Sequence, residues 1–425
     1  MREIVVIGGG AAGMMAAVAA AGRGSHVTLL EKNEKLGKKI YITGKGRCNF
    51  TNACEVQQLF AAVVSNPKFL YSAFYGFTNE MVMEFFGSRG MPFKVERGNR
   101  VFPVSDHSSD VIRALQRTLE EKQVNVLLHT RVLSVEQSQG AVTGVRIRDQ
   151  KHRERFVKAD RVIVAAGGCS YPSTGSDGDG YAWGKEMGHR ITPLRPALVP
   201  LVTKEAYIPL MQGLSLKNVE LSLKNQKGKI CYREFGEMLF THFGISGPLV
   251  LSASSVVGAL LEKEGELTGR IDLKPALSSQ QLEERLLREF SANANRQLSN
   301  VMRSLLPSKM VEPLIGLSGI SQEKPAREIT REERARLVEL LKAFPFTVCG
   351  TRGFREAIIT QGGISVKDIN PSTMESRKVR GLYFAGEVLD LDALTGGYNL
   401  QIAWSTGHLA GCSAAEEAGE DTGRG

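Results

Sequence analysis

Residues 3–32 read EIVVIGGGAAGMMAAVAAAGRGSHVTLLEK, in which apolar segments alternate with glycines and small residues. An apolar strand at 4–7 runs into a glycine turn, a helix of small residues begins at Ala11, and a second apolar strand at 27–30 ends at Glu31. Three glycines in the turn have the spacing GxGxxG: Gly8, Gly10 and Gly13. Strand, glycine turn, helix and strand in this order predict a dinucleotide-binding, Rossmann-like α/β unit rather than a glycine-rich turn of another kind.

Each part of the motif has a mechanical role. Gly8 permits the tight turn, Gly10 leaves no side chain between the backbone and a pyrophosphate, and Gly13 lets the helix approach the strand. The phosphates are expected at the positive N-terminus of the helix. Glu31 lies where a carboxylate accepts hydrogen bonds from an adenosine ribose and repels a 2′-phosphate, which favours FAD or NAD over NADP.

Composition limits the class of protein. A chain of 425 residues with 42% hydrophobic and 23% charged residues is long enough for roughly two or three domains of ordinary soluble type. No membrane segment, targeting segment or metal-ligand spacing is apparent, so we expect a cytoplasmic protein without a metal. The six cysteines form no CxxC pair, which argues against a dithiol flavoenzyme: Cys48, Cys54, Cys169, Cys231, Cys349 and Cys412.

The net charge of +9 suggests an anionic partner. The basic residues are dispersed and interleaved with acids at helical spacing, which is typical of solvated helix faces. Attraction of an anionic cofactor accounts for the excess, and we expect no nucleic acid partner.

Residues 32–52 follow the second strand and have the composition of a polar loop, with the alternative that they form a solvated basic turn. The loop could reach along the dinucleotide with four side chains: Lys38, Lys39, Thr43 and Arg47. Further on, 67–89 predicts helices whose aromatic segment FLYSAFYGF belongs to the core rather than to a nucleic-acid stacking surface. An amphipathic helix is predicted from Ser108, which is a suitable N-cap.

Two strands are predicted within 124–149, with a turn at 138–140, and Val132 lies where its backbone could pair with an adenine edge. The next strand, 162–165, runs into Ala166, Gly167 and Gly168, which leaves backbone exposed at the edge of the sheet where ligands bind. A purely structural connection is the alternative. A helix is predicted at about 181–188.

The pattern changes near 193. It becomes β-like to about 275 and helical over 280–344, which predicts an inserted domain. The glycine-containing break at 239–247 holds His242, which is either a structural hydrogen bonder or a substrate-facing residue. The chain then returns with strands around 362–363 and a strand before Glu387. Gly396 and Gly397 precede a long helix whose positive end can stabilise the negative charge of a reduced flavin, and the acidic tail from Glu416 predicts a frayed end.

Four motifs together resemble the BaiN/RdsA family of FAD-dependent oxidoreductases, also described as YhiN-like. They are GGGAAG at 8–13, GKGRCNFTN at 44–52, THFGISGP at 241–248 and GLYFAGEVLDLDALTGGYNLQIAWSTG at 381–407. The resemblance implies an FAD domain at 1–192 and 362–425, of the two-dinucleotide-binding type, with a β-barrel and helical insert at 193–361. It covers essentially the whole chain.

The resemblance also implies roles for individual residues. Gly8, Gly10, Ala12 and Gly13 would hold the pyrophosphate, Glu31 with the neighbouring Lys32 the adenosine side, and Val132 the adenine. The flavin side would be lined by Lys39, Thr43, Gly44, Arg47, Cys48 and Asn49. Ala166, Gly167 and Gly168 would flank the cofactor, Gly386 and Glu387 the ribityl and phosphate region, and Tyr398, Asn399 and Leu400 the pyrimidine end. Asn49, His242 and Tyr398 are the substrate-facing expectations.

The activity that follows from the resemblance is hydride transfer through flavin N5, from NAD(P)H to a small unsaturated or carbonyl compound. No second GxGxxG follows a strand, so NAD(P)H would dock transiently as the reductant. Three alternatives remain: an oxidase of a small, aminoacetone-like amine that uses O2, a flavin-dependent RNA-modifying protein, and a flavin-binding scaffold without turnover. The sequence identifies neither a catalytic acid nor an oligomeric state.

Overall fold

A computed structural model gives the fold and describes residues 1–416, so most of the predicted frayed tail lies outside the described residues. The chain divides into two compact units. Unit 1 consists of Met1–Pro196 and Ile358–Gly425, and unit 2 is Ala197–Ala357, so that unit 2 interrupts the chain of unit 1.

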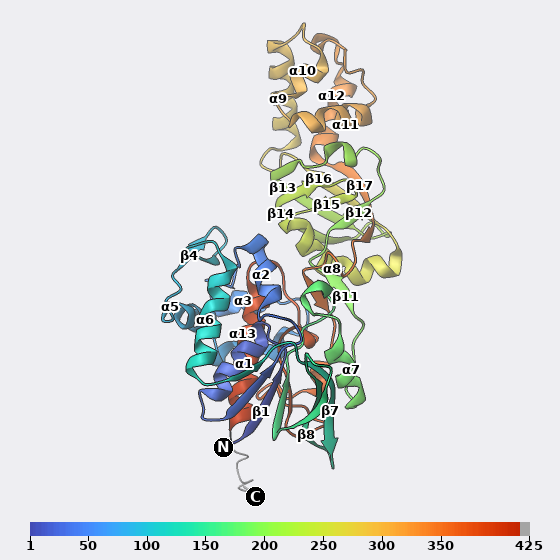
Figure 1. Cartoon of the computed structure of the whole chain (residues 1–425). Helices are drawn as coiled ribbons and strands as arrows, with labels where there is room; N and C mark the ends of the chain where they lie inside the picture. The colour runs from blue at the N-terminus through green and yellow to red at the C-terminus, as the bar shows by residue number, and fades with distance from the viewer. Residues whose placement is uncertain (417–425) are drawn as a thin grey trace, which may run out of the picture. The chain divides into compact units, whose positions relative to one another are not determined.

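Unit 1 is organised around a five-stranded parallel sheet (Figure 1). Its strand order is β19-β10-β1-β2-β6. Ile7 pairs with Leu30 on one side and with Val164 on the other, and Val164 pairs with Phe384, so the carboxyl ends of four strands meet at one edge. The bounds are β1 (Glu3–Ile7), β2 (His26–Leu30), β6 (Asn125–Leu127), β10 (Arg161–Val164) and β19 (Leu382–Phe384).

The order of the sheet reverses at β1. The strand that follows β1 in the chain, β2, lies on one side, whereas β10 lies on the other. In open α/β sheets, the crevice outside such a switch point is where ligands bind. The helix between β1 and β2, α1 (Ala11–Ala21), therefore begins at the edge where a ligand is expected.

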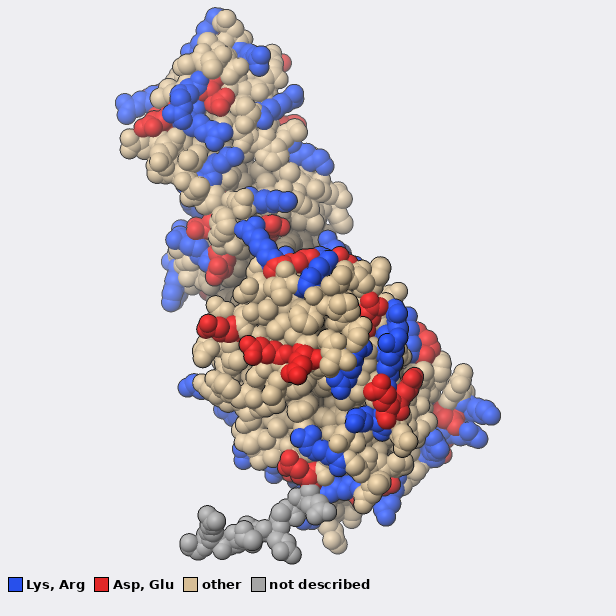
Figure 2. All heavy atoms as spheres, turned by 90° about the vertical axis from the view of Figure 1, so that its left-hand side faces the viewer, with Lys and Arg blue, Asp and Glu red and all other residues tan. Residues whose placement is uncertain are grey.

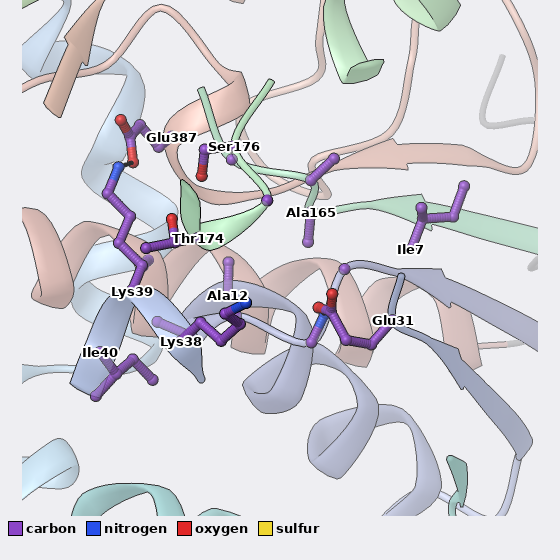
Figure 3. Close-up of a pocket in the computed structure, with 18 of the residues that line it drawn as sticks. Ile7, Ala12, Glu31, Lys38, Lys39, Ile40, Ala165, Thr174, Ser176 and Glu387 are labelled. Atoms are coloured by element: carbon purple, nitrogen blue, oxygen red, sulfur yellow. Dashed lines mark hydrogen bonds and ion pairs between the residues drawn. The ribbon is translucent and has the colours of Figure 1, made fainter. Parts of the chain in front are cut away.

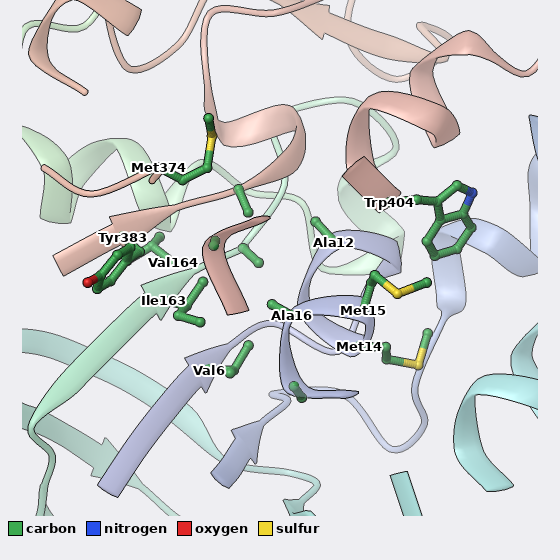
Figure 4. Close-up of a cluster of buried hydrophobic side chains, with 14 of the residues drawn as sticks. Val6, Ala12, Met14, Met15, Ala16, Ile163, Val164, Met374, Tyr383 and Trp404 are labelled. Carbon is green, nitrogen blue, oxygen red and sulfur yellow. The ribbon is translucent and has the colours of Figure 1, made fainter. Parts of the chain in front are cut away.

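Two layers cover the sheet (Figure 1). One consists of α1, α6 (Ser108–Glu121) and α13 (Tyr398–Ala415), and the other is an antiparallel sheet of β7 (Arg131–Ser138), β8 (Ala141–Arg148) and β9 (Glu154–Lys158). Val6 and Ile163 from the sheet and Met14, Met15 and Trp404 from the helices are buried (Figure 4). Burial of such side chains stabilises the fold by about 1.5–3 kcal/mol each.

Glycines bring α13 into direct contact with α1. A Cβ atom at Gly407 would lie 2.3 Å from the carbonyl oxygen of Ala12, and one at Gly411 would lie 2.2 Å from that of Ala16. No side chain fits at such distances, so the two helices pack backbone against backbone. This contact fixes the first turn of α13 relative to the glycine turn of α1.

Several local predictions for unit 1 need correction. The segment 32–52 is not all loop, because it forms α2 (Lys38–Ile42) and a 3₁₀ turn at Thr43–Gly46. Ser108 does not cap α6, because its hydroxyl donates to the carbonyl of Tyr41 at 2.8 Å and the cap position is His107.

The aromatic segment is only partly core. Tyr71 and Tyr75 are 53% and 55% exposed, with their rings stacked 6.2 Å apart. They lie on α4 (Tyr71–Gly76), between a 3₁₀ turn at Pro67–Leu70 and α5 (Asn79–Gly87). The prediction of helices for 67–89 is confirmed.

Unit 2 is a closed six-stranded barrel with a helical bundle. The sequence predicted strands to about 275 and then helices, but a 17-residue helix, α8 (Pro248–Glu264), lies among the strands, and the strand that closes the barrel, β17 (Phe344–Thr351), follows the bundle. The bundle consists of α9 (Ser279–Ala292), α10 (Leu298–Met302), α11 (Ser308–Ser318) and α12 (Arg331–Lys342). The other strands are β12 (Leu201–Thr203), β13 (Ser215–Lys224), β14 (Ile230–Phe240), β15 (Gly244–Ser246) and β16 (Leu267–Asp272).

These units agree with the predicted class, an α/β sheet domain interrupted by a barrel with helices. Within residues 1–416, none of the helices combines the length and apolar character that crossing a membrane requires.

Backbone packing of α1 against α13 generates a stability prediction. We expect Gly411→Ala to lower the free energy of unfolding by roughly 1–3 kcal/mol, because the new methyl group overlaps the Ala16 carbonyl. Gly316→Ala in α11 is the matched control, because a Cβ there meets nothing within 4 Å. The control should be neutral or stabilised by up to about 1 kcal/mol. Denaturant unfolding measures both, and an equal response of the two variants would contradict the close packing.

Candidate functional site

A cavity lies at the carboxyl edge of the parallel sheet in unit 1 (Figure 3). It encloses about 1300 Å³, counting the space at its open mouth. Its walls come from the β1–α1 turn, the ends of β2 and β10, α2, the loop before α7 (Asp179–Glu186), and the first turn of α13. Its lining extends from Glu31 on one side to Lys39 and Glu387 on the other (Figure 3), which favours an extended ligand.

The glycine turn forms the floor of this cavity. Gly8 has φ of +105°, and a Cβ there would lie 2.5 Å from the carbonyl oxygen of Ala165 on the neighbouring strand. A Cβ at Gly13 would lie 1.9 Å from the Gly8 carbonyl oxygen, whereas one at Gly10 would meet nothing within 4 Å. Gly8 and Gly13 are therefore required for packing, and Gly10 leaves open space beside the N-terminus of α1.

Glu31 stands at the end of β2 and is almost fully buried, at 8% exposure. Its Oε2 accepts the amide of Gly9 at 2.7 Å, and its Oε1 accepts the backbone amide and the side-chain amide of Asn33 at 2.8 and 2.7 Å. A carboxylate has about four acceptor sites, so three bonds leave roughly one for a ligand. The protein thus fixes this carboxylate at the cavity wall.

A charged cluster holds the loop 171–179 beside the cavity. Lys32 Nζ donates to Asp177 at 2.6 Å and to Asp179 at 3.1 Å, and Arg131 donates to Asp179 at 3.0 Å. Burial alone would raise the pKa of Asp177, but the hydrogen bond and charge of Lys32 outweigh it, so the pKa is below its usual value. The side-chain amide of Asn33 also donates to the Thr174 carbonyl at 3.0 Å.

Lys39 and Glu387 face each other on the side of the cavity away from Glu31 (Figure 3). Lys39 Nζ lies 2.6 Å from Glu387 Oε2 and 2.6 Å from Ser170 Oγ. Glu387 Oε1 accepts the Ser170 hydroxyl at 2.7 Å and the amide of Thr360 at 2.8 Å. The ion pair is therefore part of a connected polar network.

The cavity brings together many of the residues that the sequence singled out. The predicted residues that line it are Gly8, Gly10, Ala12, Glu31, Lys32, Lys39, Thr43, Val132, Ala166, Gly167, Glu387, Asn399 and Leu400. Lys38, expected to reach along the dinucleotide, lines it as well. These residues come from segments separated by up to several hundred positions, and the sheet edge gathers them.

Other predicted residues support the wall without lining it. Gly13 packs α1 on β1, as described above. A Cβ at Gly168 would lie 2.4 Å from Thr360 Oγ1, and one at Gly386 would lie 2.7 Å from the Ala12 methyl group. Both glycines permit close approaches directly behind lining residues.

The loop 44–49 lies apart from the cavity lining. Arg47 is bound by Glu96 and by Asp106, whose Oδ1 is 2.7 Å away, and these hydrogen bonds raise its pKa. Cys48 is fully buried in the core, and burial raises the pKa of its thiol. A Cβ atom at Gly44 would lie 3.3 Å from the amide nitrogen of Asn49.

Two of the substrate-facing expectations, Asn49 and Tyr398, lie at the start of α13 in unit 1, whereas His242 belongs to unit 2, and the role of all three stays a prediction. Asn49 Oδ1 accepts a hydrogen bond from the backbone amide of Val101 at 3.1 Å. The same oxygen would lie 3.0 Å from a Cβ atom at Gly397, the residue before α13. Tyr398 packs against Gly396, and burial, followed by the neighbouring Cys54, raises its pKa. His242 is exposed in unit 2, between β14 and β15.

Sequence reasoning missed several residues of the site. Ser170 and Thr360 hold the Lys39–Glu387 pair, and Asn33 holds Glu31 and the loop 171–179. Hydrophobic lining by Ile358 and Ile359 was also missed. Ser170 lies two residues after the predicted segment Ala166–Gly168, so its position gave a usable signal. The other missed residues reach the site only through tertiary contacts.

Known proteins resemble this chain over nearly its whole length. The family model described as "HI0933-like protein Rossmann domain" matches residues 2–413. A "3-dehydro-bile acid delta(4,6)-reductase" of Clostridium scindens is 35% identical, and the alignment covers 98% of this chain and 100% of the relative. A "Ribosomal RNA dihydrouridine synthase" of Haemophilus influenzae is 32% identical over 98% of this chain and 99% of the relative.

Solved structures share the fold at low identity. The 3-ketosteroid-Δ4-(5α)-dehydrogenase of Rhodococcus jostii has a TM-score of 0.55 at 16% identity, with 98% of this chain and 97% of that chain covered. The 3-ketosteroid Δ1-dehydrogenase of Sterolibacterium denitrificans has a TM-score of 0.54 at 15% identity, with 98% and 100% covered. These similarities show the fold alone. The family match and the two full-length relatives show that the chain belongs to the HI0933-like family, the BaiN/RdsA family of FAD-dependent oxidoreductases.

Proposed function

We propose that the cavity of unit 1 binds FAD and that the enzyme reduces a carbon–carbon double bond conjugated to a carbonyl group. The open space beside Gly10 suits a pyrophosphate at the N-terminus of α1. The remaining acceptor site of Glu31 suits a ribose hydroxyl, and Val132 lies on the adenine side. The observation that carries the proposal is this extended cavity on a glycine turn, in a chain of a flavoenzyme family.

The reaction class is supported by what the relatives' names have in common. The names "3-dehydro-bile acid delta(4,6)-reductase" and "Ribosomal RNA dihydrouridine synthase" both describe saturation of a double bond. In a 3-oxo steroid with Δ4 and Δ6 bonds, and in uracil, that double bond is conjugated to a carbonyl. A hydride adds to the distal carbon and a proton to the carbon next to the carbonyl.

FAD, when bound, supplies the hydride donor at N5. The chain's own contribution is to bind, orient and stabilise charge. Asn399 and Leu400 line the cavity in the first turn of α13, so the free amides at that helix end can stabilise negative charge by up to roughly 2 kcal/mol. Asn399 is held in place because its side chain accepts the Ala393 amide at 2.9 Å and donates to the Ala393 carbonyl at 2.8 Å.

NAD(P)H is the proposed reductant, which is oxidised as the substrate gains two hydrogen atoms. The sequence has one GxGxxG after a strand, so the nicotinamide nucleotide would dock transiently. The hydride then passes from NAD(P)H to the acceptor in two separate half-reactions. Two electrons leave NAD(P)H with the hydride and reach the substrate, the second hydrogen is a proton taken from water, and no further oxidant is needed.

A second candidate substrate is uridine in RNA. The relatives from Haemophilus influenzae and Escherichia coli carry that activity in their names, and the net charge of +9 favours a polyanion. Against it, the face shown in Figure 2 interleaves Lys and Arg with Asp and Glu and presents no continuous basic surface. The expectation of no nucleic acid partner stays a prediction, and a small enone is the first substrate that we propose.

Product analysis tests the reaction class. We expect anaerobic enzyme with NADH or NADPH to add the mass of two hydrogen atoms to a 3-oxo-4,6-diene steroid. A ribosomal RNA transcript, incubated in parallel, tests whether uridine in RNA is the substrate. RNA binding that weakens steeply with salt would support that second candidate. Mass spectrometry of both substrates gives the result. If neither substrate gains hydrogen while an amine is oxidised with O2, the oxidase alternative replaces the proposal.

Retention of FAD should depend on the charged cluster at the loop 171–179. Asp177→Asn removes one partner of partly exposed ion pairs, each worth roughly 0.2–1 kcal/mol, so FAD release should become about 1.5–5 times faster. Release is followed by the rise of flavin fluorescence on dilution. Asp149→Asn is the control, because it breaks the ion pair with Arg153 on the β8–β9 turn. Equal release from both variants would contradict a role of this loop in holding FAD.

A further inference from the structure

The helix α2 separates the cavity from the surface of unit 1. Lys38, Lys39 and Ile40 line the cavity (Figure 3). Tyr41 and Ile42 follow directly, but they do not line the cavity and are 51% and 40% exposed. Large apolar side chains that are exposed together beside a ligand cavity, rather than scattered singly, mark a contact surface.

The segment that contains α2 is strongly basic. Residues 32–47 carry six Lys or Arg side chains and one acid, Glu34. Lys35 and Lys45 are exposed, and within residues 1–416 neither lies within ion-pair distance of a carboxylate. The unbalanced positive charge therefore belongs to these two lysines. The other four cations are paired: Lys32 with Asp177 and Asp179, Lys38 with Glu34, Lys39 with Glu387, and Arg47 with Glu96 and Asp106.

The exposed ring of Tyr41 is held in place. Lys35 Nζ lies 4.9 Å from the centroid of this ring, in a cation–π contact. The Tyr41 amide donates to the Gly37 carbonyl at 2.9 Å, and the Tyr41 carbonyl accepts the Ser108 hydroxyl at 2.8 Å. Lys45 lies in the turn Thr43–Gly46 that follows α2. A fixed aromatic ring with unpaired lysines on either side of it in the chain matches a base that is attached to phosphates.

We propose that the α2 outer surface, formed by Lys35, Tyr41, Ile42 and Lys45, docks the adenosine phosphate part of NAD(P)H. Tyr41 stacks on the adenine, Ile42 adds apolar contact, and the two lysines bind the phosphates. The inference rests on the proposed function, in which NAD(P)H reduces the flavin, and it names the site where that reductant docks.

The position of the surface suits this role. Thr43 follows Ile42 and lines the cavity, and the family resemblance places Thr43 on the flavin side. The surface thus adjoins the end of the cavity that the nicotinamide has to reach, and the resemblance assigns none of its residues to FAD. An RNA chain presents the same bases and phosphates, but its affinity depends on many phosphate contacts, whereas this surface offers two unpaired cations.

Reduction of the flavin tests the inference. The holoenzyme is mixed anaerobically with increasing concentrations of whichever nucleotide reduces the wild type, NADH or NADPH, and bleaching of the flavin band is followed by stopped flow. Tyr41→Ala should raise the nucleotide concentration for half-maximal rate roughly 5-fold or more, because base stacking is lost. The limiting rate at saturation should stay the same.

The lysines are tested together in the double variant Lys35→Gln and Lys45→Gln. The half-saturating concentration should rise about 2-fold or more, because two exposed ion pairs with phosphate are lost. It should also depend less on ionic strength than in the wild type, since salt screens those pairs. A variant that merely disturbed the structure would not change this salt dependence.

Controls separate docking from loss of structure. Tyr41→Phe keeps the ring and should behave like the wild type. Tyr75→Ala removes a tyrosine of similar exposure, 55%, on α4, and Lys227→Gln removes an exposed lysine in the turn between β13 and β14. Neither should change the half-saturating concentration. FAD content and reduction by dithionite, which needs no docking site, should be equal in all variants.

Unchanged half-saturation in both Tyr41→Ala and the double lysine variant would overturn the inference. A lower limiting rate with unchanged half-saturation would overturn it as well, because the residues would then act on the flavin rather than on docking. If these variants weaken binding of a ribosomal RNA transcript but not reduction by the nucleotide, the surface binds RNA and the inference is wrong.

The outcomes for the proposed function are distinct. If dithionite reduces the wild-type flavin but neither nucleotide does, the proposed reductant fails and the inference fails with it. If a nucleotide reduces the flavin with the expected dependence on Tyr41 and the lysines, but no conjugated substrate is turned over, the proposed reaction fails and the inference stands.

Discussion

The close approach of α1 to β1 at Gly13 is the contact on which the site depends. A side chain at Gly13 would overlap the carbonyl oxygen of Gly8, and one at Gly8 would overlap that of Ala165. Because no Cβ intervenes, the helix begins directly at the carboxyl edge of the sheet, at its switch point. The positive end of α1 and the open backbone at Gly10 then face the same space, and α13 extends the arrangement through Gly407 and Gly411.

A parallel sheet explains how residues so far apart in the sequence form one site. The carboxyl ends of parallel strands meet at one edge, so each loop that follows a strand contributes to the same cavity. Lys39 and Glu387 are 348 positions apart and yet form an ion pair at 2.6 Å. The chain thereby places charged side chains around the cavity, while the strands behind them end in apolar residues: Ile7, Leu30, Val164 and Phe384.

The parts of the fold that could be predicted are those with local signals. Glycine spacing and the apolar strands gave β1, α1 and β2 nearly to the residue, and Gly396 and Gly397 predicted the start of α13. Lys38–Ile42 was predicted as loop because its lysines and the flanking glycines have the composition of a loop, although the segment forms one short helix. The helix α8 was missed because it lies in a β-like region, and β17 because the bundle separates it from the other strands of its barrel.

In the site, too, the residues that could be predicted are those with a local sequence signal. Residues that follow a strand or a glycine turn were found, because their position alone implies the sheet edge. Arg47 was expected beside the cofactor from its charge, but Glu96 and Asp106 bind it, and acids 49 and 59 positions away carry no local signal. Thr360 was missed for the same reason, since only the folded chain brings its amide to Glu387.

An anaerobic absorption spectrum of the purified protein, titrated with NADH and then with NADPH, tests whether the cavity of unit 1 holds a reducible FAD. We expect a flavin band that is bleached by one of these nucleotides and restored by an enone acceptor. A protein without a flavin band would contradict the assignment of the cavity. A flavin band that ignores both nucleotides would contradict the reductase, and oxygen consumption with amines would then be the reaction to measure.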